Sequence, residues 1–230
     1  PDFPSIRNAT HNSLTRAFLH QRWWLNDPDV LLLDPDLPVS EAEFETLATV
    51  TALSGGLLLV SGQLSKIPAH RVKQWSALLP LINQRPRLVD WMDAQTPTRL
   101  RLDLQNGSGP WHLLAYFNWD DKPETISFDL TAFSLPGAQH AIAREFWTGQ
   151  VHLLTTSQNP VITLPAHGVR LFALRGLQPR APAYLGSDLH ISQGMEITRW
   201  QIVETDQQHT LHMRLERPAC SQGSMDLYLP

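Results

Sequence analysis

The spacing of apolar residues changes near Asp90, and this change limits the folds that are open to the chain more than any other feature does. Before Asp90, apolar residues recur every three or four positions, as they do along one face of a helix. After it they alternate with polar residues, as in Arg99–Leu104, which is the pattern of a strand with one buried face. We therefore predict an α/β part over residues 1–90 and an all-β part over residues 91–230.

The first part contains helical segments separated by short apolar runs. Ser40 and Glu43 form a capping box and Gly55-Gly56 supplies a stop, so a helix is predicted over 40–54. The apolar run 57–60 does not alternate, which predicts a parallel strand buried on both faces. Two further helices, one capped by Ser5 and one over 68–82, and a short strand over 23–25 complete the pattern of a parallel α/β fold. Two parallel strands do not form a stable sheet alone, so this part is expected to belong to a larger unit.

The second part is predicted to be an antiparallel sandwich or barrel, because many short strands alternate with turn signals. Asn106-Gly107 and Thr148-Gly149 are two of these turns. The predicted strands cover residues 99–104, 111–118, 125–130, 142–147, 161–164, 169–174, 196–203, 210–217 and 225–229.

Charge and composition exclude several classes of function. A net charge of -4 gives no basic footprint for nucleic acid, and the sequence has no apolar run of membrane-spanning length. The single cysteine, Cys220, cannot form an internal disulfide, which fits either a reducing, cytoplasmic location or a protein that does not use disulfides. The ten histidines lack the spacing of metal ligands and no cofactor motif is present, so neither metal nor cofactor is expected. The chain begins at Pro1 without methionine, so we expect either a processed N-terminus or a part of a longer protein.

A polar cluster, Asn26, Asp27 and Asp29, follows the predicted strand at 23–25. Pro28 fixes the backbone between the two carboxylates, so they cannot point the same way. Side chains just after a barrel strand face the active site, and carboxylates suit sugar hydroxyls. The alternative is a simple turn, since Asn, Asp and Pro are common turn residues, and the four residues alone favour the turn.

The wider sequence resembles the melibiase-type α-galactosidases. Trp24–Asp29 is similar to their W-x-N-D-P-D stretch, and Leu47–Gly56 looks like their seventh barrel helix entering strand eight. Three later segments look like landmarks of their C-terminal β-sandwich: Ala115–Trp119, Phe146–Gly149 and Leu164–Arg170. The resemblance implies a C-terminal fragment of a (β/α)8 TIM barrel over residues 1–90, followed by an antiparallel β-sandwich over 91–230.

The resemblance further implies a retaining glycoside hydrolase, with a nucleophile and an acid/base Asp on barrel strands upstream of Pro1. Asp2 is a candidate for the acid/base, with a loop residue as the favoured alternative. Asp29 maps onto the carboxylate that contacts the sugar, and Asn26 and Asp27 support it. Trp24 either lines the pocket or faces the barrel helices.

The sequence departs from the family pattern at two places, and the resemblance does not predict the pocket contacts there. Ser61–Leu64 replaces an acidic or amide pair, and Val30 stands where relatives often have Met or Cys. The fragment alone is expected to be inactive. Its expected partners are a carbohydrate substrate and the remaining barrel segment or a second copy of the chain. The alternative is a non-catalytic carbohydrate-binding or interface module.

Overall fold

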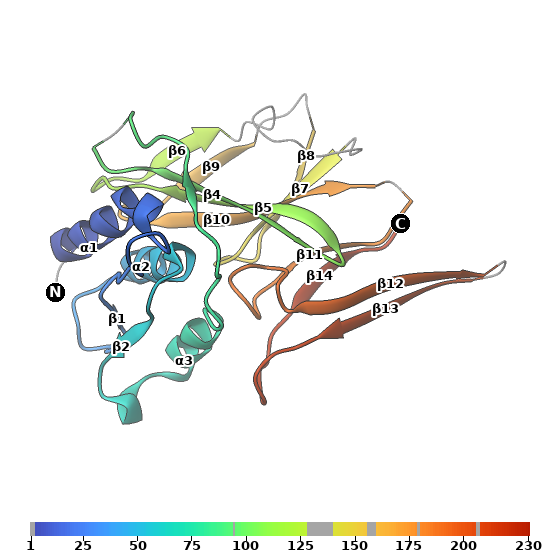
Figure 1. Cartoon of the computed structure of the whole chain (residues 1–230), viewed down its shortest axis with the longest axis horizontal. Coiled ribbons are helices and arrows are strands. Elements are labelled where there is room, and N and C mark those ends of the chain that lie inside the picture. The colour runs from blue at the N-terminus through green and yellow to red at the C-terminus, as the bar shows by residue number, and fades with distance from the viewer. Residues whose placement is uncertain (1–2, 94, 128–139, 156–159, 179, 206–207) are drawn as a thin grey trace. The chain divides into compact units, whose positions relative to one another are not determined.

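The computed structural model describes residues 3–93, 95–127, 140–155, 160–178, 180–205 and 208–230. The chain divides into two compact units, which are described separately. Unit 1 comprises residues 1–102, 114–126 and 162–171, and unit 2 comprises 103–113, 127–161 and 172–230. The α-helices in the described ranges all belong to unit 1 (Figure 1). None of these helices combines the length and the apolar character needed to cross a membrane.

Helix α2 (Glu41–Ser54) is the best-defined element of unit 1, and the prediction for it is confirmed. The Ser40 hydroxyl accepts a hydrogen bond from the Glu43 amide, and the Glu43 carboxylate accepts one from the Ser40 amide, so the capping box is complete. Gly55 ends the helix in the left-handed conformation, with φ of 72°. From Phe44 onward, most of its side chains are buried, which explains why the sequence is apolar on more than one face.

The other two α-helices differ from their predictions. Helix α1 (Phe3–Thr15) already includes Ser5, so the prediction that Ser5 caps it is wrong. Helix α3 (Ala69–Ser76) is shorter than predicted, and Pro80 disfavours a helical conformation at the residue before it. Two single 3-10 turns, η1 (Ala17–Leu19) and η2 (Leu64–Lys66), connect these elements.

Strands β1 (Val30–Leu32) and β2 (Leu59–Ser61) form a two-stranded parallel sheet. Val30 lies opposite Leu59 and Leu32 opposite Ser61. The strand predicted over 23–25 is wrong, because the chain there makes only an isolated bridge between His20 and Trp24. Strand β2 is not buried on both faces as predicted, since Leu59 is 48% exposed. A two-stranded sheet has no further strands to cover its outer edge.

The second predicted part consists of antiparallel strands. A six-stranded sheet has the order β3-β4-β5-β10-β7-β8, and the pairs β3–β4, β10–β7 and β7–β8 are antiparallel. Its strands are β3 (Arg87–Leu88), β4 (Arg99–Asn106), β5 (Gly109–Phe117), β7 (His140–Glu145), β8 (Val151–Leu154) and β10 (Val169–Leu177). Strands β4, β5 and β10 each run from one unit into the other along the chain. Three two-stranded sheets accompany it: β6 (Glu124–Ser127) with β9 (Val161–Leu164), β11 (Ala183–Ser187) with β14 (Met225–Tyr228), and β12 (Ile197–Thr205) with β13 (Gln208–Leu215).

Unit 2 holds two buried arginines. The Nε of Arg144 lies 2.6 Å from the Asp226 carboxylate, and its Nη1 donates to the Ser187 carbonyl and to the Gln193 side chain at 3.0 Å each. The guanidinium of Arg175 lies 4.3 Å from the centre of the Trp111 ring. Burial lowers the pKa of Arg175 to about 10, so it stays charged at neutral pH.

Candidate functional site

The polar motif forms a bulge on the first strand of the parallel pair. The Leu57 amide donates to the Asn26 carbonyl at 3.0 Å, and Val30 is paired with Leu59. Between these two points, the chain leading into β1 has three residues, 27–29, whereas the chain leading into β2 has only one, Leu58. The extra residues cannot join the ladder and must leave the plane of the sheet. The predicted order, a strand followed by carboxylates, is therefore wrong, because Asp29 precedes β1.

Asn26 anchors the bulge rather than facing solvent, because its side chain is buried. Its Nδ2 donates to the Ser13 carbonyl at 3.3 Å, and its Oδ1 accepts from Trp24 Nε1 at 3.2 Å. Its amide donates to Nδ1 of His20 at 3.0 Å. Burial, reinforced by the charge of Arg85, lowers the pKa of His20, which keeps the ring neutral and Nδ1 free to accept.

Asp27 and Asp29 are both exposed, and each uses one carboxylate oxygen locally. Asp27 Oδ1 accepts from the Asp29 amide at 3.0 Å, and Asp29 Oδ1 accepts from the Val30 amide at 2.8 Å. Asp29 has φ of 70°, a left-handed conformation that Asp tolerates better than most residues. Among the described residues, the second oxygen of each carboxylate has no recorded partner. These two oxygens can therefore accept hydrogen bonds from a ligand.

The same side-chain contact occurs twice, although the backbone differs, because Asp29 has a positive φ and Asp36 does not. Asp34-Pro35-Asp36 follows β1, and its Asp36 amide donates to Asp34 Oδ1 at 3.0 Å, as in the earlier Asp-Pro-Asp. The turn hypothesis thus accounts for the side-chain contact at both places, and the contact itself does not identify a sugar site. The sequence reasoning overlooked this second copy, although the repeated Asp-Pro-Asp string was visible.

The remaining predicted residues are placed as follows. Trp24 is 44% exposed, and its indole nitrogen is held by Asn26, so part of the ring is open to a ligand. The acid/base candidate Asp2 lies outside the described residues. Ser13 and His20, which hold Asn26, were not predicted, because their contacts depend on the packing of α1 against the motif. Within the described ranges, no group of three or more His, Cys, Asp or Glu side chains is arranged to hold a metal ion.

Comparison with known proteins identifies the second predicted part. Residues 101–174 match the family model described as the alpha galactosidase C-terminal beta sandwich domain. Residues 101–174 are therefore similar to the C-terminal β-sandwich domain of the melibiase-type α-galactosidases. The matched range contains all three melibiase landmarks named from the sequence, and the resemblance to this family is confirmed. The Asn26–Asp29 motif lies outside the matched range.

Solved structures share the fold of this chain at low sequence identity. A GH27 β-L-arabinopyranosidase from Geobacillus stearothermophilus is 16% identical, with a TM-score of 0.61 over 78% of this chain and 43% of the other. α-Galactosidase I from Mortierella vinacea is 13% identical, with a TM-score of 0.53 over 74% and 44%. An α-galactosidase from Saccharomyces cerevisiae solved with raffinose is also 13% identical, with a TM-score of 0.54 over 75% and 51%. The chain thus spans about half the length, or less, of these structures.

Proposed function

We propose that this chain is the C-terminal portion of a retaining, α-galactosidase-like glycoside hydrolase that acts on terminal α-galactosides when complete. Residues 1–90 would supply the last two strands and helices of its (β/α)8 barrel. The observation that carries the proposal is the matched β-sandwich preceded by the parallel pair β1–β2 with α2 between its strands. A parallel pair joined through a helix is the repeating unit of such a barrel.

In this proposal Asp29 contacts the sugar, and the bulge replaces the strand end as the device that exposes it. Its free oxygen would accept a hydrogen bond from a sugar hydroxyl, and Asn26 holds the backbone from beneath. Trp24 would offer an apolar ring face beside it. The nucleophile and the acid/base would come from the preceding polypeptide, so these 230 residues alone are expected not to hydrolyse an aryl α-galactoside.

The second Asp-Pro-Asp supplies a matched control for this assignment. In the longer natural protein, Asp29→Asn should lower kcat/KM about 10- to 100-fold, the usual effect of weakening one charged hydrogen bond to substrate. Asp36→Asn alters a carboxylate in the same Asp-Pro-Asp string and should leave kcat/KM unchanged within about twofold. An equal loss in both variants, or a larger loss in Asp36→Asn, would refute the role of Asp29.

We further propose that the remaining barrel segment covers the apolar surface beside the parallel pair. The large apolar side chains of Trp23, Leu25 and Leu64 are 80%, 59% and 68% exposed, and burial of each of them by a further segment would be favourable. Intact-mass measurement of the source protein should therefore give a mass well above 26.0 kDa. Sedimentation of the 230-residue chain should show self-association. A chain that remains monomeric at all concentrations would contradict this proposal.

A further inference from the structure

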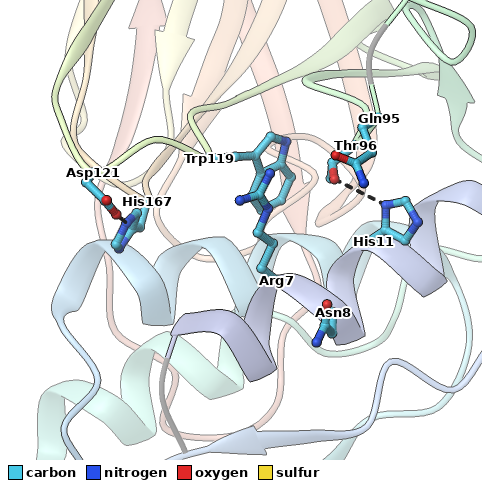
Figure 2. A pocket seen from close by; sticks show the side chains of 8 residues that line it. All are labelled: Arg7, Asn8, His11, Gln95, Thr96, Trp119, Asp121 and His167. Atoms are coloured by element: carbon cyan, nitrogen blue, oxygen red, sulfur yellow. Dashed lines mark hydrogen bonds and ion pairs between the residues drawn. The ribbon is translucent and has the colours of Figure 1, made fainter.

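A cavity of about 540 Å³ lies within unit 1, and the assignments above do not use it. Helix α1 supplies three of its lining residues, the segment before β4 supplies two, and turns between the β-strands supply the others (Figure 2). The lining residues are Arg7, Asn8, His11, Gln95, Thr96, Trp119, Asp121 and His167. Its volume falls within the range of about 300–1,000 Å³ that is typical of small-molecule sites. We propose that this cavity binds a neutral sugar.

One end of the cavity is fixed by His167, which bridges two carboxylates. Its Nδ1 lies 3.1 Å from Glu43 on α2, and its Nε2 lies 2.7 Å from Asp121 (Figure 2). Each ring nitrogen of His167 therefore faces a carboxylate oxygen, which fixes the orientation of the ring. The Thr46 hydroxyl also donates to the His167 carbonyl at 2.8 Å. Asp121 uses Oδ1 in this contact, and among the described residues its other oxygen has no recorded partner, so it can accept a hydrogen bond from a ligand.

The wall and the opposite end of the cavity are also held in place. Trp119 Nε1 donates to the Pro97 carbonyl at 2.9 Å, and its ring stacks on Phe117 with 5.2 Å between centroids. Trp119 is only 7% exposed, so it offers the ligand a narrow apolar strip. At the far end, His11 Nδ1 lies 3.2 Å from the Thr96 hydroxyl, which leaves Nε2 for a ligand (Figure 2). These contacts fix the orientation of the Trp119 ring and connect His11 to Thr96.

The remaining lining groups carry unused donors and acceptors. Arg7 and Asn8 lie on the same face of α1 as His11, four and three residues before it. Figure 2 shows the Arg7 side chain extending toward Trp119. Among the described residues, the guanidinium of Arg7 and the side-chain amides of Asn8 and Gln95 have no recorded partner. Together they provide five guanidinium donors, and amides that both donate and accept.

This mixture selects among ligand classes. The lining has no aliphatic side chain, which disfavours an apolar ligand. The lining sets the Arg7 guanidinium, which only donates, against the Asp121 carboxylate, which only accepts, so a ligand that does both matches it better than a phosphate or carboxylate, which only accepts. Sugar hydroxyls both donate and accept, so they match alternating amide, guanidinium and carboxylate groups beside an aromatic strip. A neutral sugar therefore fits the cavity best.

The test is a titration of the 230-residue chain with D-galactose, followed by tryptophan fluorescence and by the indole signals in NMR spectra. We expect a saturable change with a Kd in the millimolar range, including a shift of the Trp119 indole signal. Arg7→Gln and Asn8→Ala should each weaken binding about tenfold. Arg16→Gln and Asn12→Ala change the same residue types outside the lining and should leave the Kd unchanged.

Three outcomes would overturn the proposal. One is the absence of a saturable change, and another is saturation by inorganic phosphate but not by galactose. The third is an equal loss of affinity in Asn8→Ala and Asn12→Ala. Asp29→Asn in the same titration should leave the Kd unchanged, because binding that depended on Asp29 would lie at the strand bulge. The readout is binding rather than turnover, so this proposal can fail or succeed independently of the hydrolase assignment.

Discussion

Gly56→Ala tests whether the parallel pair and its bulge are built as described. A Cβ at position 56 would lie 1.6 Å from the Asn26 carbonyl oxygen and 2.5 Å from its carbon, far inside van der Waals contact. Gly56 does not have a positive φ, so alanine could adopt its backbone conformation and the conflict is purely steric. The two strands would have to separate where the Leu57 amide meets the Asn26 carbonyl.

The separation lowers the free energy of unfolding through two contributions. Losing the hydrogen bond to a carbonyl of the buried Asn26 costs about 1–3 kcal/mol, and overpacking costs about 1–3 kcal/mol more. The free energy of unfolding should therefore fall by about 2–6 kcal/mol. Urea unfolding followed by circular dichroism measures this change as a lower midpoint.

A second glycine provides the control. A Cβ at Gly107 would meet its nearest atoms, in Trp200, at 3.7 Å and 3.8 Å, which is ordinary contact. Gly107→Ala should therefore change the free energy of unfolding by no more than about 0.5 kcal/mol. If Gly56→Ala were as stable as Gly107→Ala, the close approach of Gly56 to Asn26 would be refuted, together with the bulge register derived from it.

Three other substitutions test contacts within unit 1 or within unit 2. Burial alone would raise the pKa of Glu43, but hydrogen bonds from Ser40 and the contact with His167 outweigh burial and lower it. A lowered pKa contributes stability above the unfolded value, about 4.3, that is lost as the pH falls toward the folded value. Glu43→Gln should remove this acid dependence in thermal melts between about pH 3 and 6, and an unchanged profile would disprove it. Trp111→Phe removes the donor at 2.9 Å from the Ser192 carbonyl, so urea unfolding should show a loss of about 1–3 kcal/mol. Arg144→Met leaves the Ser187 carbonyl and the Gln193 side chain without their donor and should cost about 3 kcal/mol by the same assay, whereas a loss below about 1 kcal/mol would count against the contacts of the buried guanidinium.

Local signals in the sequence predicted local structure well. The capping box at Ser40 and Glu43 and the stop at Gly55 gave the bounds of α2, because each is a contact within a few residues. Strict alternation located β4, whose buried residues occur at every second position. Strands β8 and β11 were missed, because Val151–Leu154 does not alternate and β11 contains Gly186, which has φ of 148°.

The candidate site depended on longer-range geometry. The string Asn26–Asp29 was found from the sequence, but the bulge arises from the register between β1 and β2, which no single segment encodes. The cavity was not predicted for the same reason. Its residues come from positions as far apart as Arg7 and His167, and each of them has an ordinary local explanation.

The bulge also affects which amino-acid substitutions the chain can accept at positions 27 and 29 during evolution. The Leu57 amide bonds to Asn26, and the regular ladder resumes at Val30, so no strand pairing constrains the side chains at positions 27 and 29. The two positions are held instead by their own local contacts, in which Asp29 Oδ1 accepts from the Val30 amide and Asp29 has φ of 70°. Position 29 is therefore restricted to residues that tolerate the left-handed conformation, such as Asn or Gly, and position 27 does not have that restriction.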